Sequence, residues 1–352
     1  MSDLATAVAP HFCLKNSGKL TSFVRLLLLI VLALNTAGCG TFMARSLTRA
    51  PNRYPSWFAA EAPVTLAFNP KLLTNFVARY ADVGPPSARL CYRVIEPADY
   101  HLVVTSTNWL KHGRPEYEFT FRAKVPAPPN RWTSTPRGTV LLLHGYGLAQ
   151  FSMMPWAFRL ADEGWRCVLV DLRGHGKSTG RQIYFGLRET NDLSQLLNVL
   201  ARDHQLTGPV AAVGESYGAA LALRWQTVEP RVHSVVAMAP YASLSNAVMN
   251  IRQQYAWWVP KFWVRAGLKQ LPIILQIPPD EFDLTTVLMQ KPVTALFVAG
   301  ADDRIAPVKD VEQLRALALP DSKMIIVAGA THESLTYYFS DLAPPILSWL
   351  TK

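Results

Sequence analysis

The feature that most constrains this chain is a short stretch, Gly214-Glu215-Ser216-Tyr217-Gly218, set between two very different neighbours. Residues 209–213 before it are apolar, which predicts a buried strand. Residues 219–228 after it are rich in Ala and Leu and end before a proline, which predicts a helix. A serine between two glycines at a strand-to-helix turn is typical of a nucleophile, because so tight a turn leaves no room for side chains beside it.

From residue 138 onward, apolar strand-like runs alternate with helical segments, which predicts a mostly parallel sheet covered by helices on both faces. Residues 241–290 interrupt the alternation, and Pro260 predicts two helices there and not one. The expected strands are 139–143, 166–171, 209–213, 232–238, 291–298 and 324–327, and the expected helices are 150–163, part of 184–204, 219–228, 308–317 and most of 334–350.

Residues 40–135 do not show this alternation of strand-like and helical segments. Residues 40–87 contain six prolines, and we interpret them as a tether and packing segment with one helix at 70–80. Residues 88–135 hold strand-like runs at 88–95, 101–106 and 117–125, which predict an antiparallel edge to the larger sheet. The predicted organisation is therefore a signal segment at 1–39, the tether at 40–87 and one domain at 88–352.

The N-terminus is typical of an export signal, with basic residues before an apolar run at 26–34 and small residues after it. The small residues directly before Cys39 resemble a bacterial lipoprotein cleavage box, which would make Cys39 a lipidation site, although Thr36 departs from the usual leucine. The alternatives are an uncleaved anchor, since residues 26–44 carry no charge, and a simply cleaved signal. All three interpretations place the folded domain outside the cytoplasm.

Charge and cysteine content limit the classes of binding partner and cofactor that we expect. The net charge is +10, and without residues 1–38, which hold three basic residues and one acidic residue, it is +8. This charge favours an anionic membrane surface. The basic residues are scattered and form no nucleic-acid-binding motif, so we expect no nucleic acid. No metal-ligand spacing is present, and we expect neither a metal nor another cofactor. Cys91 and Cys167 lie in apolar runs, which favours two buried thiols over a disulfide between them.

Three other loops follow predicted strands and carry candidate catalytic groups. Residues 299–307 contain Asp302 and Asp303, residues 328–333 contain His332, and residues 144–147 read His-Gly-Tyr-Gly. The carboxyl ends of parallel strands meet at one edge of a sheet, so these loops are expected to gather around Ser216.

These pieces together resemble the α/β-hydrolase superfamily, and within it the serine-aminopeptidase-like and monoacylglycerol-lipase-like enzymes. The resemblance rests on HGYG at 144–147, DLRGHGKS at 171–178, GESYG at 214–218 and the late acid and histidine loops. It covers roughly residues 88–350. It implies an α/β-hydrolase fold, with residues 241–290 as a helical lid.

The resemblance also implies roles for individual residues. Ser216 corresponds to the nucleophile, His332 to the base and Asp303 to the acid that orients the base, with Asp302 as the alternative acid. The backbone N–H groups of Tyr146 and Tyr217 correspond to the oxyanion hole.

Other polar residues near these loops are given structural interpretations. The resemblance implies that His144, Arg173 and His175 are structural. Glu189 and Asp192 are interpreted as helix-start residues and surface charge.

In the middle of the lid segment, aromatic side chains are interleaved with basic ones; the aromatics are Tyr255, Trp257, Trp258, Phe262 and Trp263. These aromatics either pack on the catalytic domain or face a bilayer or acyl chains. The expected function is an extracytoplasmic, membrane-anchored serine hydrolase that cleaves carboxylic esters, acyl or lipid-like, through an acyl-enzyme. The alternatives are an amidase, peptidase or thioesterase with the same triad, and a non-catalytic binding protein of this fold. The sequence sets neither the natural substrate nor the oligomeric state.

Overall fold

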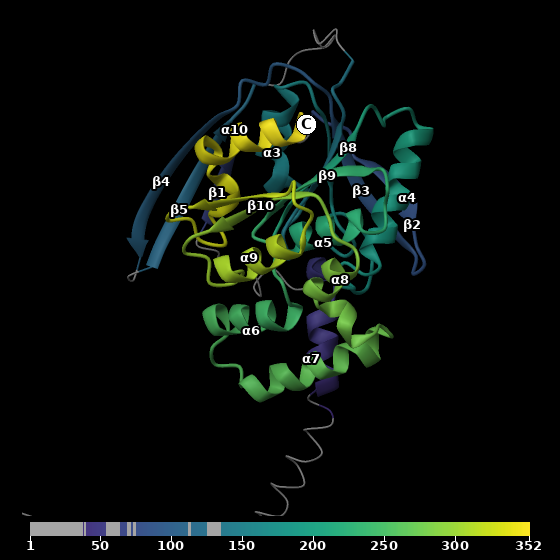
Figure 1. The fold of residues 1–352 in the computed structure, drawn as a ribbon, viewed down its shortest axis with the longest axis vertical. Coiled ribbons are helices and arrows are strands. Elements are labelled where there is room, and N and C mark those ends of the chain that lie inside the picture. The colour runs from purple at the N-terminus through teal and green to yellow at the C-terminus, as the bar shows by residue number, and fades with distance from the viewer. Residues whose placement is uncertain are drawn as a thin grey trace, which may run out of the picture.

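The structure is a computed structural model that describes residue 38, residues 40–53, 64–68, residue 72, residues 75–111, 114–124 and 135–352 (Figure 1). Cys39 and the apolar run at 26–34 lie outside the described residues, and so does the start of the helix expected at 70–80.

Eight strands form the main sheet in the order β11-β10-β9-β8-β6-β7-β3-β2. The strands from β6 to β11 run parallel, β3 is antiparallel to β7, and β2 is antiparallel to β3. β6, β8 and β10 are buried along their whole length, as expected for short apolar runs covered on both faces. The bounds are β2 Arg79–Val83, β3 Ala88–Ile95, β6 Thr139–Leu143, β7 Arg166–Val170, β8 Val210–Glu215, β9 Val232–Met238, β10 Ala295–Gly300 and β11 Lys323–Val327.

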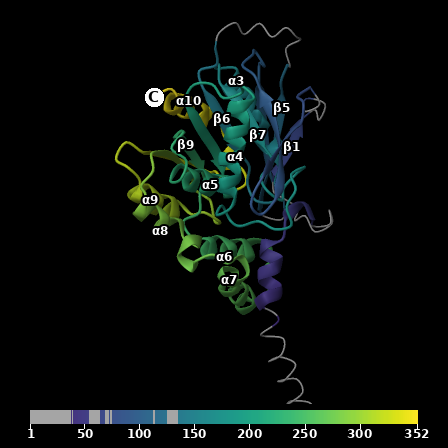
Figure 2. The same cartoon turned by 90° about the vertical axis from the view of Figure 1, so that its right-hand side faces the viewer.

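Helices cover both faces of this sheet, which confirms the predicted fold class (Figure 2). On one face, α3 (Met154–Ala161) packs on α10 (Phe339–Leu350), where the Trp156 ring stacks on Phe339 with 4.4 Å between the ring centroids. On the other face, α5 (Tyr217–Gln226) lies against β8 and β9, with α4 (Glu189–Arg202) and α8 (Leu284–Gln290) beside it. α9 (Val308–Leu317) packs on β10 and β11.

The antiparallel edge predicted from residues 88–135 is only partly present. β3 joins the main sheet, but β4 (Val103–Lys111) and β5 (Arg114–Arg122) form a separate three-stranded sheet with β1 (Val64–Phe68), in the order β1-β5-β4. The reason lies in β5, whose alternating Tyr117, Phe119 and Phe121 pack against Tyr337 just before α10. The second sheet accordingly lies beside α10 (Figure 1).

The helix expected at 70–80 is wrong in its described second half. Residues 75–78 are not helical, and Arg79–Val83 is strand β2. Ala81 and Val83 are buried while their neighbours are exposed, a period of two that suits a strand. The main sheet therefore begins upstream of residue 88.

Residues 241–290 form a helical cap at the carboxyl ends of the strands (Figures 1 and 2). The cap consists of α6 (Leu244–Tyr255), α7 (Lys261–Leu275), η4 (Pro279–Phe282) and α8. α7 begins directly after Pro260, which confirms the predicted division into two helices. Residues 40–48 are helical and lie along α7, where a Cβ added to Gly267 would come within 2.5 Å of Met43 Cγ.

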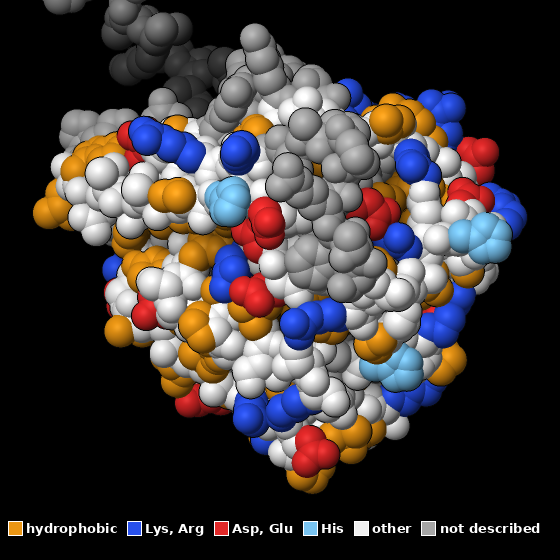
Figure 3. All heavy atoms as spheres, turned by 90° about the horizontal axis from the view of Figure 1, so that it is seen from above, with side chains coloured by type: hydrophobic (Ala, Val, Ile, Leu, Met, Phe, Trp, Pro, Cys, Tyr) orange, Lys and Arg blue, Asp and Glu red, His pale blue; other side chains and the backbone are white. Residues whose placement is uncertain are grey.

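Residues 49–53 continue from this helix onto the loop after β7. The Ala50 N–H donates to the Arg181 carbonyl at 3.2 Å, and the Asn52 side chain donates to the Ser178 carbonyl at 2.9 Å. Within the described ranges, no helix is long and apolar enough to cross a membrane. Figure 3 shows the face opposite the cap, where basic side chains are spread among acidic and uncharged ones.

Candidate active site

Ser216 occupies a strained turn between β8 and α5, with φ 48° and ψ −110°. The two flanking glycines permit this turn. A Cβ at Gly214 would come within 2.3 Å of the Gly218 carbonyl oxygen, and a Cβ at Gly218 within 2.2 Å of the Leu143 carbonyl oxygen. Both contacts are with backbone, which cannot move aside, so glycine is required at each position.

His332, on the loop after β11, lies between Ser216 and Asp303. Its Nε2 is 2.8 Å from Ser216 Oγ, and its Nδ1 is 2.8 Å from Asp303 Oδ2. In this arrangement Nδ1–H donates to the carboxylate, so Nε2 presents its lone pair to the serine hydroxyl. The structure thus brings together the three side chains that the sequence predicted as nucleophile, base and acid.

Asp303 is held by its own loop after β10. Its side chain is fully buried, and Oδ1 accepts the backbone N–H groups of Ile305 and Ala306, both at 2.8 Å. The neighbouring Asp302 is exposed. Of the two acids left open by the sequence, it is therefore Asp303 that lies against His332.

The environment of His332 sets its pKa. Burial alone lowers the pKa of the imidazole, but the charge and hydrogen bond of the Asp303 carboxylate outweigh burial and raise it above its usual value. The nearby carboxylates of Glu333 and Glu215 add to this rise. The site therefore favours the protonated form of His332.

The two residues predicted to supply the oxyanion hole lie next to each other. The rings of Tyr146 and Tyr217 meet edge to face with 6.4 Å between their centroids. Tyr217 is the first residue of α5, where the helix dipole favours negative charge. Tyr146 follows Gly145, whose N–H donates to Glu215 Oε1 at 3.0 Å.

Sequence reasoning assigned no role to Glu215. It is the last residue of β8, directly before Ser216 and at a variable position of the Gly-x-Ser-x-Gly pattern, and it is only 6% exposed. Because the Gly-x-Ser-x-Gly pattern accepts any residue at this position, it does not predict what the Glu215 side chain contacts. The one available clue was a charged residue directly after an apolar strand.

His144 and His175 are buried and make backbone contacts, in keeping with the structural roles expected for them. His144 Nε2 accepts the Leu172 N–H at 3.0 Å, and Nδ1 is 2.8 Å from the Gly145 carbonyl oxygen. Burial lowers the pKa of His144 to about 4, and burial together with His144 lowers that of His175 to about 3. Both rings are neutral at pH 7.

The expectation that Glu189 and Asp192 are surface charge is wrong. Both are buried, at 1% and 2% exposure. Asp192 forms a two-point ion pair with Arg173, at 2.6 and 2.7 Å, and Glu189 accepts the N–H groups of Tyr184 and Gly186. Buried carboxylates need such partners to offset the loss of water. Because all of these partners lie on the loop after β7, the start of α4 holds that loop in place.

The cap contacts the loop that carries His332 directly. Tyr255 at the end of α6 donates its hydroxyl to the carboxylate of Glu333, the residue after His332, and Gln254 donates to the same oxygen at 3.1 Å. The other four aromatics between residues 255 and 263 are exposed. Trp257, Trp258, Phe262 and Trp263 are each at least 40% exposed, the first two by 68% and 66%.

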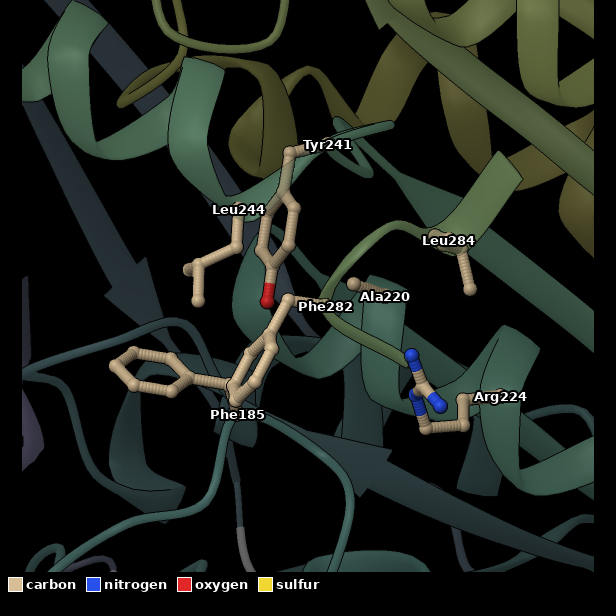
Figure 4. A pocket seen from close by; sticks show the side chains of 7 residues that line it. All are labelled: Phe185, Ala220, Arg224, Tyr241, Leu244, Phe282 and Leu284. Atoms are coloured by element: carbon tan, nitrogen blue, oxygen red, sulfur yellow. The ribbon is translucent and has the colours of Figure 1, made fainter. Parts of the chain in front are cut away.

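A small pocket lies between α5 and the root of the cap (Figure 4). At one end the Arg224 guanidinium pairs with Glu281 Oε2 at 2.7 Å. The free volume is about 10 Å³, roughly the space that one water needs. The pocket is a small gap between packed side chains under the cap, and it is too small for an acyl chain. Its walls are Phe185, Ala220, Arg224, Tyr241, Leu244, Phe282 and Leu284.

Cys91 and Cys167 are free and buried, as the sequence favoured. In the part of the chain that the structure describes, no group of His, Cys, Asp and Glu side chains could hold a metal ion.

Comparison with known proteins agrees with this architecture. A family model described as serine aminopeptidase, S33 matches residues 134–286. The uncharacterized protein YqkD of Bacillus subtilis (strain 168) is 25% identical over 187 residues, which are 50% of this chain and 58% of that protein. A monoacylglycerol lipase of Mycolicibacterium smegmatis is 29% identical over 132 residues, 36% of this chain and 46% of that enzyme. The chain thus spans about half the length of the curated relatives it matches.

Among solved structures, an esterase of Pyrococcus furiosus aligns with a TM-score of 0.57 at 17% identity, covering 86% of this chain and 97% of that one. Together with the strand order and the turn at Ser216, this similarity defines an α/β-hydrolase fold.

Proposed function

We propose that this protein is a serine hydrolase that cleaves carboxylic esters through an acyl-enzyme intermediate. The observation that carries the proposal is the hydrogen-bonded line from Ser216 through His332 to Asp303, each link 2.8 Å long. A serine hydroxyl is a weak nucleophile until a base is in place to take its proton, and this geometry supplies one.

The reaction would proceed in two halves. Ser216 Oγ attacks the ester carbonyl carbon while its proton passes to His332 Nε2, and the carbonyl oxygen becomes an oxyanion facing the N–H groups of Tyr217 and Tyr146. When the intermediate collapses, the bond to the alcohol oxygen breaks and His332 returns the proton to that oxygen. Water then attacks the acyl carbon while its proton passes to His332. The bond from the acyl carbon to Ser216 Oγ breaks, His332 returns the proton to Oγ, and the acid is released.

Acyl groups on lipids or lipid-like esters are the substrates we propose. The support is the exposed aromatic surface of the cap and the similarity to a monoacylglycerol lipase. An amide, peptide or thioester substrate would use the same triad, and the serine aminopeptidase family model favours the peptide alternative.

A fluorophosphonate probe tests the nucleophile. The wild type should be labelled and Ser216→Ala should not, while p-nitrophenyl esters of graded chain length and a matched p-nitroanilide measure the preferred substrate. Equal labelling of the Ser216→Ala variant would refute the assignment. Faster turnover of the anilide than of any ester would replace the esterase with the amidase alternative.

We also propose that the protein is anchored to a membrane outside the cytoplasm by its N-terminus, with lipidation at Cys39. The export-type sequence before Cys39 supports this proposal. The helix at 40–48 follows directly and lies against α7, which would bring the exposed cap aromatics near the anchor. Cells supplied with labelled palmitate should label the wild type but not Cys39→Ser. Equal uptake by the variant would exclude Cys39 as the lipid site.

A further inference from the structure

Glu215 stands out among the buried charged residues because it joins three separate elements. Its Oε1 accepts the Gly145 N–H at 3.0 Å and the Ser152 hydroxyl at 2.9 Å. Gly145 lies on the loop after β6, Ser152 lies in η3 (Gln150–Met153), and Glu215 itself ends β8 next to the nucleophile. Within the described ranges Glu215 forms no ion pair with a basic side chain. A buried carboxylate without a cation is costly, so its two hydrogen bonds must compensate.

The peptide group between Gly145 and Tyr146 is the one whose orientation matters for the oxyanion. Its carbonyl oxygen accepts from His144 Nδ1, at 2.8 Å, and from the Leu148 N–H, at 3.2 Å. In a planar trans peptide the N–H points opposite to the C=O. The two donors on the Gly145 carbonyl therefore fix the direction in which the Tyr146 N–H points, away from His144 and Leu148.

Glu215 fixes the other side of the same glycine. A glycine rotates freely about both of its backbone bonds, so holding only its carbonyl would leave the loop free to swing. The Glu215 carboxylate holds the Gly145 N–H, and Ser152 holds the carboxylate. Both backbone polar groups of Gly145 are then tied down, one by the residue that precedes the nucleophile.

We propose that Glu215 is a positioning residue that couples the oxyanion loop to the nucleophile turn, so that the N–H groups of Tyr146 and Tyr217 keep a fixed spacing. This inference rests on the proposed serine hydrolase function. The acceptor oxygen is what the role requires, because the hydrogen bond to Gly145 sets the geometry. A carboxylate charge beside a developing oxyanion would not by itself favour the reaction.

Two substitutions separate the acceptor from the charge. Glu215→Gln keeps an oxygen at the same reach and removes the charge, whereas Glu215→Ala removes both. With p-nitrophenyl acetate we expect Glu215→Ala to lower kcat about 100-fold or more, the cost typical of a lost oxyanion donor, with KM within about threefold. Glu215→Gln should keep kcat within about tenfold of wild type, and Ser152→Ala should fall between Gln and Ala.

Thermal unfolding checks that each variant is folded. If folded Glu215→Ala keeps more than a third of the wild-type kcat, or if Gln and Ala lose kcat equally, the inference is overturned. If Glu215→Ala does not fold, the Gln variant decides: kcat within about tenfold of wild type supports the inference, and a greater loss overturns it.

The same series separates this inference from the proposed function. An active wild type with an inactive Ser216→Ala and a fully active Glu215→Ala would overturn the positioning role alone. A wild type that neither turns over esters nor reacts with a fluorophosphonate would overturn both.

Discussion

Two histidines, His144 and His332, follow strands of the same parallel sheet and end at the same edge, yet their surroundings differ. His144 comes after β6 and contacts only backbone atoms among its hydrogen-bond partners, at Gly145 and Leu172. His332 comes after β11 and lies between a hydroxyl and a carboxylate. Burial lowers the pKa of both rings, but only His332 has an acid that reverses the shift.

The difference shows what turns a buried histidine into a base. A neutral ring held by backbone groups can orient a loop, but it is not basic enough to accept a proton at pH 7. A carboxylate on Nδ1 both fixes the tautomer and stabilises the charge that forms on Nε2. The contrast gives four predictions.

The largest expected effect is on the base. His332→Ala, like Ser216→Ala, should lower kcat for p-nitrophenyl esters by about 10⁴-fold or more, because removal of either member disables the triad. His144→Gln should cost far less, since a neutral side chain with an acceptor can keep the Leu172 N–H satisfied. Steady-state kinetics with circular dichroism as a folding check measure both. A greater loss in His144→Gln than in His332→Ala would reverse the two roles.

The acid comes next. Asp303→Asn should lower kcat about 10³- to 10⁴-fold, because an amide cannot hold His332 in the required tautomer as a carboxylate does. Asp302→Asn changes an exposed neighbour and should leave kcat within about twofold, which makes it a matched control. If the two variants ranked the other way, the acid would be Asp302.

The pH dependence of kcat/KM follows from the raised pKa of His332. The base must be neutral in the free enzyme, so kcat/KM should rise with pH through an acid limb above pH 6.5, the usual histidine value. In Asp303→Asn the residual activity should show this limb at lower pH, since burial then acts without the opposing charge. If the acid limb stayed at the same pH in the variant, it would not report the titration of His332 beside Asp303.

The smallest expected effect is on stability in acid. The pKa of His144 is about 4 in the folded state, so the unfolded chain binds the extra proton between roughly pH 4 and 6.5, and the free energy of unfolding falls as pH falls. The contribution is about 2 kcal/mol between pH 7 and 5. His332 has the opposite sign, because its raised pKa stabilises the fold below its unfolded value and that contribution is lost as pH rises through the folded value.

Urea unfolding of wild type and His144→Gln at pH 7 and pH 5 measures this contribution. The variant should lose less stability on acidification than the wild type, by about the amount above. Identical losses in the two proteins would show that folding does not lower the pKa of His144.

The sequence predicted the main sheet well because its strands are short, apolar and buried on both faces, so each one stands out locally. It predicted β3 at 88–95 and α9 at 308–317 with the bounds that the structure has. The proximity of Ser216, His332 and Asp303 follows from the same topology, since all three come after parallel strands.

The features that the sequence did not predict depend on contacts between segments that are distant in the chain. The pattern of β5 (Arg114–Arg122) indicates a strand but does not say which sheet it joins. Its partner Tyr337 lies 215 to 223 residues further along the chain and reaches β5 only in the folded protein. Glu189 and Asp192 resemble ordinary acids at a helix start, and only the folded loop after β7 buries them. The contacts of Glu215 could not be predicted because its two partners, Gly145 and Ser152, lie 70 and 63 residues upstream.

The contact of Met43 with Gly267 bears on where the chain can be shortened. A protein trimmed to begin at residue 54 would lose the segment that covers α7 and the hydrogen bonds that Ala50 and Asn52 make with the loop after β7. The newly bared strip of α7 would add to an already aromatic surface and favour self-association. A shortened protein that keeps these contacts therefore starts at or before residue 40, well ahead of the first strand of the main sheet.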